Sequence, residues 1–354
     1  MENNDYLWTK HGDPDPEIAR LESLLSPYAF DTNTLTDARA RRTRALPARP
    51  PGRARAYTRR RLLFATTAAF VALVVVVIWL DTRLQWPMAQ AWSVKPVSGT
   101  TTINDRILSG RSLLPPGGVL RTGEHSAVQI EVARIGRVVV GEDSQVELVE
   151  TRTGHHRLRL DHGQLSARIW APPASFGVQT PLANALDVGC EFTLSVTSAG
   201  SGLLRVRHGW VELEKYGLQS LIPEGAQAEL DSKAGPGTPF DDHATAQFRA
   251  ALKAIDALGR SVPANDPAIE QLAKASSAKD AITLISLLTR YPQLADTPIY
   301  DRAIAVIPPP DGLSRDAVRY KNQVLMDDWW RKLPYSRVKS WWLRWPDLLQ
   351  DETP

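Results

Sequence analysis

An uncharged run from Leu62 to Leu80 constrains this chain more than any other feature of its sequence. It holds 19 residues, LLFATTAAFVALVVVVIWL, between Arg59-Arg60-Arg61 and Asp81. At about 1.5 Å of rise per residue, a helix of this length just crosses a hydrocarbon core of about 30 Å. Trp79 and Trp86 lie where the aromatic belt of a membrane interface is expected. The run therefore predicts one transmembrane helix over residues 62–80. A buried core helix and a signal peptide are the alternatives, and the 61 preceding residues disfavour the second.

Basic residues are unevenly distributed around this run. Ten arginines lie between residues 39 and 61, whereas only Arg83 and Lys95 follow within fifteen positions. The positive-inside rule then predicts a cytoplasmic N-terminus, with everything beyond Asp81 on the other side of the membrane. Residues 1–61 carry twelve basic and eight acidic residues, so the net charge of +3 arises in this tail. The basic balance is thus a juxtamembrane property, and we expect no nucleic-acid partner.

Cys190 is the single cysteine of the chain, so the part beyond the membrane has no internal disulfide. An ordinary hydrophobic core must stabilise it, and 274 residues suffice for one or two domains. This composition fits a bacterial inner-membrane protein whose bulk faces the periplasm, better than an animal ectodomain.

The cytoplasmic tail, residues 1–61, contains one short helix candidate at residues 15–26. Asp15, Pro16 and Glu17 suit its start. An apolar stripe at helical spacing follows, made of Ile18, Leu21, Leu24 and Leu25. Such a short helix needs a partner. Either it docks loosely on the membrane or on itself, or it is a recognition segment that binds a cytoplasmic protein. Residues 32–61 are rich in Arg, Pro and Ala and predict a linker.

From residue 92 to residue 232 the apolar residues alternate with polar ones. Alternation is clearest at 128–132, 146–148, 156–160, 165–169, 192–196, 204–207 and 211–214, with glycine-containing turns between these segments. Short strands without intervening helices predict an all-β domain, arranged as a sandwich, a barrel or a solenoid. If His162-Gly163 and His208-Gly209 are two-residue hairpin turns, Leu160 faces Leu165 and Val206 faces Val211. The same rhythm also fits a bend between rungs of a solenoid.

Six motifs in this region give the chain a family resemblance. They are GVLRTG at 118–123, AVQI at 127–130, LDHGQL at 160–165, FGVQTP at 176–181, GCEF at 189–192 and VRHGWV at 206–211. In this order, over about Val94 to Leu213, the set resembles the FecR domain, which commonly has threonine where Cys190 stands. The resemblance implies a periplasmic domain of short strands behind a single membrane helix. It also implies a signal relayed to an extracytoplasmic-function sigma factor that the cytoplasmic part holds.

The periodicity becomes helical in the last part of the chain, which we expect to be an α-helical domain over residues 240–354. Phe248, Leu252, Ile255 and Leu258 share one face of a first helix that ends at Gly259. Further helices are predicted to begin at Asp266-Pro267, before Ile282, at Thr297-Pro298, and at Ser314, the last carrying Val318, Leu325 and Trp329.

Five of the eleven tryptophans lie near the C-terminus, at positions 329, 330, 341, 342 and 345. On a helix, Trp341, Trp342 and Trp345 share a face, which suits contact with a membrane surface or an aromatic binding platform. The alternative, which we favour, is that the tryptophans pack the helical part against itself or against the β domain.

No constellation typical of catalysis emerges, so we expect neither an enzyme nor a cofactor or metal. His155, His156, His162 and His208 are predicted to be exposed residues near turns. Cys190 is predicted to be buried and inert. Ser276-Ser277-Ala278-Lys279 matches Ser-x-x-Lys, but a helix start explains it.

These features lead to two hypotheses about function. The first is a single-pass inner-membrane sensor whose periplasmic FecR-like domain binds a partner and reports it to a cytoplasmic regulator, for which a sigma factor is the candidate. The second is an envelope structural module that holds glycan or protein partners, with the helix as a mere anchor. A hydrolase would require clustered acid and base residues that the sequence does not display.

Overall fold

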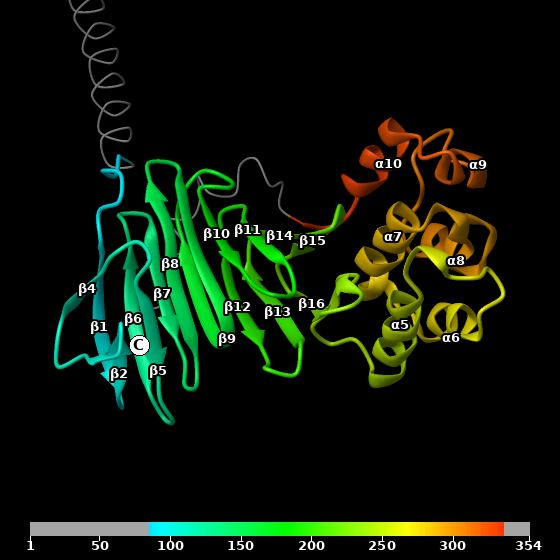
Figure 1. The fold of residues 1–354 in the computed structure, drawn as a ribbon. Helices are drawn as coiled ribbons and strands as arrows, with labels where there is room; N and C mark the ends of the chain where they lie inside the picture. Colours follow the sequence, from blue (N-terminus) through cyan, green and yellow to red (C-terminus); the bar gives the residue numbers. More distant parts are fainter. Residues whose placement is uncertain (1–84, 336–354) are drawn as a thin grey trace, which may run out of the picture. The chain divides into compact units, whose positions relative to one another are not determined.

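The computed structural model describes residues 85–335, and Figure 1 shows strands followed by helices along this part of the chain. The strands are β1 (Trp92–Ser98), β2 (Thr101–Ile103), β3 (Arg106–Ile107), β4 (Ser112–Leu114), β5 (Val119–Thr122), β6 (Ala127–Val132), β7 (Gly136–Val140), β8 (Gln145–Arg152), β9 (His155–Ile169), β10 (Phe176–Gln179), β11 (Asn184–Asp187), β12 (Glu191–Val196), β13 (Ser201–His208), β14 (Trp210–Lys215), β15 (Leu218–Pro223), β16 (Ala226–Asp231), β17 (Gly235–Pro236) and β18 (Phe240–Asp241). The α-helices are α5 (Ala246–Leu258), α6 (Pro267–Ala275), α7 (Ala281–Arg290), α8 (Pro298–Val306), α9 (Arg315–Arg319) and α10 (Gln323–Trp330). Short 3-10 helices are η3 (Gly259–Ser261), η4 (Ala278–Asp280) and η5 (Pro292–Asp296).

Within residues 85–335, no helix is long and apolar enough to cross a membrane. The predicted span at 62–80, the tail helix at 15–26 and the face formed by Trp341, Trp342 and Trp345 all lie outside the described residues.

The strands form two sheets that share β9. Sheet A has the order β4-β1-β6-β7-β9-β12-β13-β16, with β17 and β18 both paired to β16. Sheet B has the order β3-β2-β5-β8-β9-β10-β11-β14-β15. All these pairings are antiparallel except that of β9 with β10. The chain thus alternates between the two sheets, with one to three consecutive strands in each, and this builds a two-sheet sandwich in successive rungs.

The inner faces of both sheets contribute to one hydrophobic core. Along β6, β8, β9 and β12, buried and partly exposed side chains alternate, as the period of two predicts. Leu158 and Leu160 of β9 are fully buried, opposite Leu148 and Val146 of β8. Each such side chain contributes about 1.5–3 kcal/mol when it leaves water. This core, and no disulfide, stabilises the β domain.

Of the two alternatives for His162-Gly163 and His208-Gly209, the structure has the bend and not the hairpin turn. Leu160 pairs with Val146 in sheet B, whereas Leu165 pairs with Val140 and Leu194 in sheet A. Likewise β13 belongs to sheet A and β14 to sheet B. Both dipeptides are corners at which the chain passes between sheets. A corner and a hairpin turn both require a glycine and the same alternation of apolar and polar residues. The local sequence pattern therefore does not distinguish them.

The corner within β9 is tightly packed against the corner that precedes β8. Gly163 has a φ of +97°, and a Cβ built on it would lie 2.1 Å from Ser144 Oγ. Ser144 Oγ accepts a hydrogen bond from the backbone N–H of Gln164 at 2.9 Å. The backbone N–H of Ser144 in turn donates to Thr122 Oγ1 at 3.0 Å. Successive rungs are therefore joined at this end by hydrogen bonds between neighbouring corners.

Strand pairing continues past residue 232, where we expected the β domain to end. Residues of β17 and β18 pair with β16, and a separate helical core begins with Phe240 and Phe248. Helix starts follow the sequence signals: Asp266 and Thr297 cap α6 and α8, and Ser277 forms a capping box with Asp280.

Two expectations for the helical part differ from the structure. The helix expected after Ser314 is divided into α9 and α10, because the chain turns at Lys321, whose φ is +53°. Leu258 does not share the buried face of α5, since its side chain is 41% exposed. Trp329 is fully buried and donates from Nε1 to the carbonyl of Ile307 at 3.2 Å, which agrees with a packing role.

We expect Gly163→Ala to lower the free energy of unfolding by at least about 3 kcal/mol, because left-handed strain adds to the displacement of Ser144. Gly154→Ala is the matched control, since Gly154 also has a positive φ, +69°, yet nothing lies within 4 Å of its added Cβ. It should cost only about 1–2 kcal/mol. Urea unfolding of both variants measures the difference, and equal losses would contradict the close packing of the corner.

Candidate functional site

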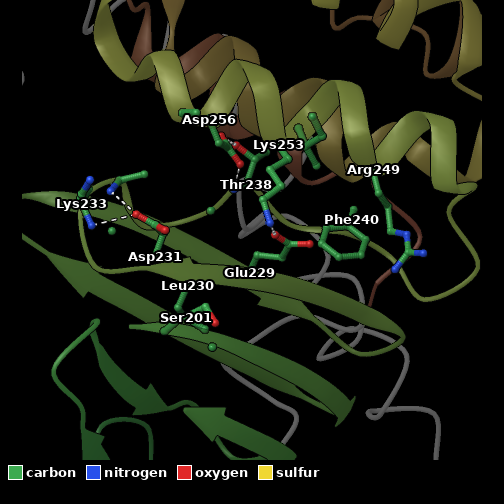
Figure 2. Close-up of a pocket in the computed structure, with 16 residues that line it drawn as sticks. Ser201, Glu229, Leu230, Asp231, Lys233, Thr238, Phe240, Arg249, Lys253 and Asp256 are labelled. Carbon is green, nitrogen blue, oxygen red and sulfur yellow. Dashed lines mark hydrogen bonds and ion pairs between the residues drawn. The ribbon is translucent and has the colours of Figure 1, made fainter. Parts of the chain in front are cut away.

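A cavity of about 320 Å³ lies where the last strands of sheet A meet helix α5. Figure 2 shows Glu229, Leu230 and Asp231 on the strand side, with Lys253 and Asp256 on the helix. Its apolar lining includes Leu230, Phe240 and Leu252. After β16 the chain turns back and runs toward α5 as a return segment, and Gly237 and Thr238 of this segment line the cavity.

Asp256 is the buried charge of this site. It accepts hydrogen bonds from the backbone N–H of Thr238 at 2.7 Å and from Thr238 Oγ1 at 2.6 Å. Arg290 of α7 lies 3.6 Å from Asp256 and donates to Thr238 Oγ1 and to the carbonyl of Pro236. Burial raises the pKa of Asp256, although the guanidinium of Arg290 opposes this rise. One carboxylate and one guanidinium thus hold the return segment, α5 and α7 together.

The mouth of the cavity carries charges of a different kind. Lys253 Nζ lies 3.0 Å from Glu229 Oε2, and both side chains are largely exposed. The Asp231 carboxylate accepts from the backbone N–H groups of Lys233 and Ala234, which form the turn after β16 (Figure 2). These two hydrogen bonds lower the pKa of Asp231. Because water screens such pairs, they contribute little to stability and remain available to a ligand.

The chemistry that this arrangement supports is binding. Both oxygens of Asp256 are already engaged by Thr238, so the carboxylate acts as a fixed structural anion. The apolar floor and the paired charges at the mouth suit a small ligand, or a side chain, with one apolar and one charged end.

A second buried titratable pair lies inside the β domain. The Cys190 thiol donates to Asp187 Oδ1, and burial raises the pKa of Asp187 to about 7. Burial and the neighbouring carboxylate also raise the pKa of Cys190 well above its usual value. Cys190 is fully buried, as the sequence predicted, and its thiol stays protonated.

One histidine contradicts the prediction that the histidines of this region are exposed. His156 is buried, and its Nδ1 lies 2.8 Å from Thr151 Oγ1, which also accepts from Trp92 Nε1 at 2.9 Å. Burial, with Arg157 nearby, lowers the pKa of His156 to about 4, so the ring is neutral at pH 7. Within residues 85–335, no three His, Cys, Asp or Glu side chains are grouped closely enough to hold a metal ion.

The candidate binding residues named from the sequence belong to parts of the chain that the structure does not describe. Ile18, Leu21, Leu24 and Leu25, like Trp341, Trp342 and Trp345, lie outside the described residues. Sequence reasoning missed Asp256 and Arg290. Asp256 lies among the buried apolar residues of α5, next to Ile255, which was the only available signal.

We expect Asp256→Ala to lower the free energy of unfolding by about 3 kcal/mol, because it leaves Thr238 without its acceptor and Arg290 without its ion-pair partner. Lys253→Ala, one helical turn away, removes only an exposed pair and should cost less than about 1 kcal/mol. Chemical unfolding followed by tryptophan fluorescence measures both losses. A cost for Lys253→Ala as large as that for Asp256→Ala would contradict this account.

Comparison with known proteins gives one match to a family model. Residues 118–212 match the family described as FecR protein. Two crystal structures of a protein from Parabacteroides distasonis ATCC 8503, described as an anti-sigma factor and determined at 1.65 and 2.50 Å resolution, are similar at 15% identity and a TM-score of 0.31. Each match covers 38% of this chain and less than two thirds, 64% and 63%, of the other. Among curated proteins there is no match. The ordered motifs and the family model agree, and residues 118–212, from β5 into β14, form a FecR domain.

Proposed function

We propose that this chain is a membrane-anchored sensor: its FecR domain lies in the bacterial periplasm, binds a partner and reports the binding event to a regulator in the cytoplasm. The observation that carries the proposal is the FecR domain itself, at residues 118–212. The apolar run at 62–80 and the arginines before it supply the anchor and the orientation. The apolar stripe of the tail is the surface that a sigma factor, or another cytoplasmic regulator, would contact.

The junction between the β domain and the helices supports a role in sensing. The cavity beside α5 is lined by residues of both parts, and the Asp256–Arg290 pair joins them through Thr238. A ligand that binds there contacts strand and helix residues together. The ligand therefore binds different arrangements of the β domain and the helices with different affinities. Such a difference in affinity is what allows a ligand to shift the population from one arrangement to another.

The proposed topology predicts which cysteines a membrane-impermeant maleimide labels in spheroplasts. Cys190 is fully buried and stays unlabelled, so it serves as an internal control. Ser198→Cys lies in the exposed turn between β12 and β13 and should be labelled before lysis. Ala45→Cys, in the arginine-rich tail, should be labelled only after lysis. Labelling of position 45 in intact spheroplasts, or protection of position 198, would show that the orientation is wrong.

The proposed signalling role predicts that residues 1–61, immobilised and exposed to the cytoplasmic fraction of the source bacterium, retain a sigma factor or another transcriptional regulator. Leu21→Asp should reduce retention at least about tenfold, since a charge on the apolar stripe opposes its burial. Ser23→Asp introduces the same charge off the stripe and should leave retention unchanged. Recovery of no regulator, or equal loss in both variants, would refute signalling through this tail.

A further inference from the structure

Among the strands that the structure describes, β15 is the edge of sheet B, and its far side has no strand partner. Of the described strands, only β14 pairs with β15, in the register Glu212 to Leu221 and Glu214 to Gln219. Ile222 belongs to the core, and Ser220 is buried and donates from Oγ to the carbonyl of Gly237 at 2.7 Å. Gln219 is exposed and Leu221 partly so. A strand edge of this kind presents backbone N–H and C=O groups that another extended chain can pair with.

This edge forms one wall of a cleft of about 740 Å³. The consecutive residues from Gly217 to Leu221 line it on the β side. The facing wall comes from the helical part and includes Tyr291 and Trp330. Trp330 donates from Nε1 to Thr289 Oγ1 at 3.0 Å, which holds its ring in a defined position. The cleft thus combines an open strand edge with a fixed aromatic surface.

Polar groups on the helical wall have unused capacity to bind. Ser286 is 8% exposed, and its Oγ has no hydrogen-bond partner among the described residues. The Nε of Arg290, whose side chain is also 8% exposed, lacks one as well. Buried polar atoms without partners are costly, so a ligand or a water that supplies acceptors here is favoured.

The charges that line the cleft favour a ligand of negative charge. Arg260 and Lys321 are exposed lining residues whose side chains form no ion pair with any described residue. Arg290 is a third cation, offset by Asp256, and Glu212 is the one acidic lining residue. Uncompensated cations beside an open strand edge favour an extended chain that carries carboxylates.

We propose that this cleft binds an extended, acidic peptide segment of a partner protein, which adds to sheet B as a strand beside β15. Its backbone pairs with β15, its acidic side chains face Arg260 and Lys321, and an apolar side chain lies against Trp330. This inference rests on the proposed function, because it names the class of partner that the sensor binds. Its test does not involve the cytoplasmic tail, residues 1–61.

The test measures binding of three nine-residue peptides to the full chain by fluorescence anisotropy. Valine alternates in them with glutamate, lysine or glutamine. The glutamate peptide should bind at least about tenfold more tightly than the lysine peptide. Methylation of its alternate backbone nitrogens, which removes strand pairing along one edge, should abolish binding. Bound glutamate peptide should also slow hydrogen exchange of the β15 amides.

The double variant Arg260→Glu/Lys321→Glu should bind the glutamate peptide at least about tenfold more weakly. The matched control Arg106→Glu/Arg134→Glu makes the same charge change at exposed positions that do not line the cleft, and should leave affinity unchanged. Absence of binding, equal affinity for the three peptides, insensitivity to methylation, or equal effects of the two double variants would overturn the proposal. So would a β15-to-β15 dimer in solution, since a second copy would then occupy the edge.

The two proposals fail separately. Peptide binding at β15 without retention of any regulator by residues 1–61 would refute only the signalling role. Retention of a regulator without peptide binding would refute only the cleft as the partner site.

Discussion

The passage of β9 from one sheet to the other is the constraint on which the β domain depends. Residues before Gly163 pair in sheet B and residues after it pair in sheet A, so one strand sets the position of both sheets. This continuity lets Leu160 and Leu165 contribute to the same core from different sheets. The corner itself leaves no room for a Cβ beside Ser144. Close backbone packing at one glycine therefore determines how two layers meet.

The helical part depends on a different kind of contact. Asp256 and Arg290 are largely buried charges from two helices, and both contact Thr238 in the segment that leaves the β domain. Removing two charges from water is costly, so such a pair adds little net stability. However, any arrangement that separates Asp256 from Arg290 leaves a charge without its partner and is higher in free energy. The pair thus favours one placement of α5 and α7 against the return segment.

This arrangement brings the regions suited to binding to the junction. Thr238 lines both the cavity beside α5 and the cleft beside β15. Ligands at either place contact residues that the Asp256–Arg290 pair holds in position. A ligand at the junction contacts both the strands and the helices, next to the segment that covalently connects them.

Much of the local structure is readable from the residues alone. Alternation identified the buried faces of β6, β8 and β12, Asp266 and Thr297 marked helix starts, and the ordered motifs indicated the FecR domain. These features depend on neighbours in the chain, so periodicity and capping chemistry reveal them.

Other features were decided only by tertiary structure. Whether His162-Gly163 is a hairpin or a corner depends on which strands are available to pair, because both satisfy the same alternation. The burial of His156 required Thr151 and Trp92, a residue far earlier in the chain. Asp256 and Arg290 belong to separate helices, and no spacing rule joins them. The sequence by itself determined which side chains avoid water, and the tertiary structure decided which strands and charges meet, since those contacts join distant residues.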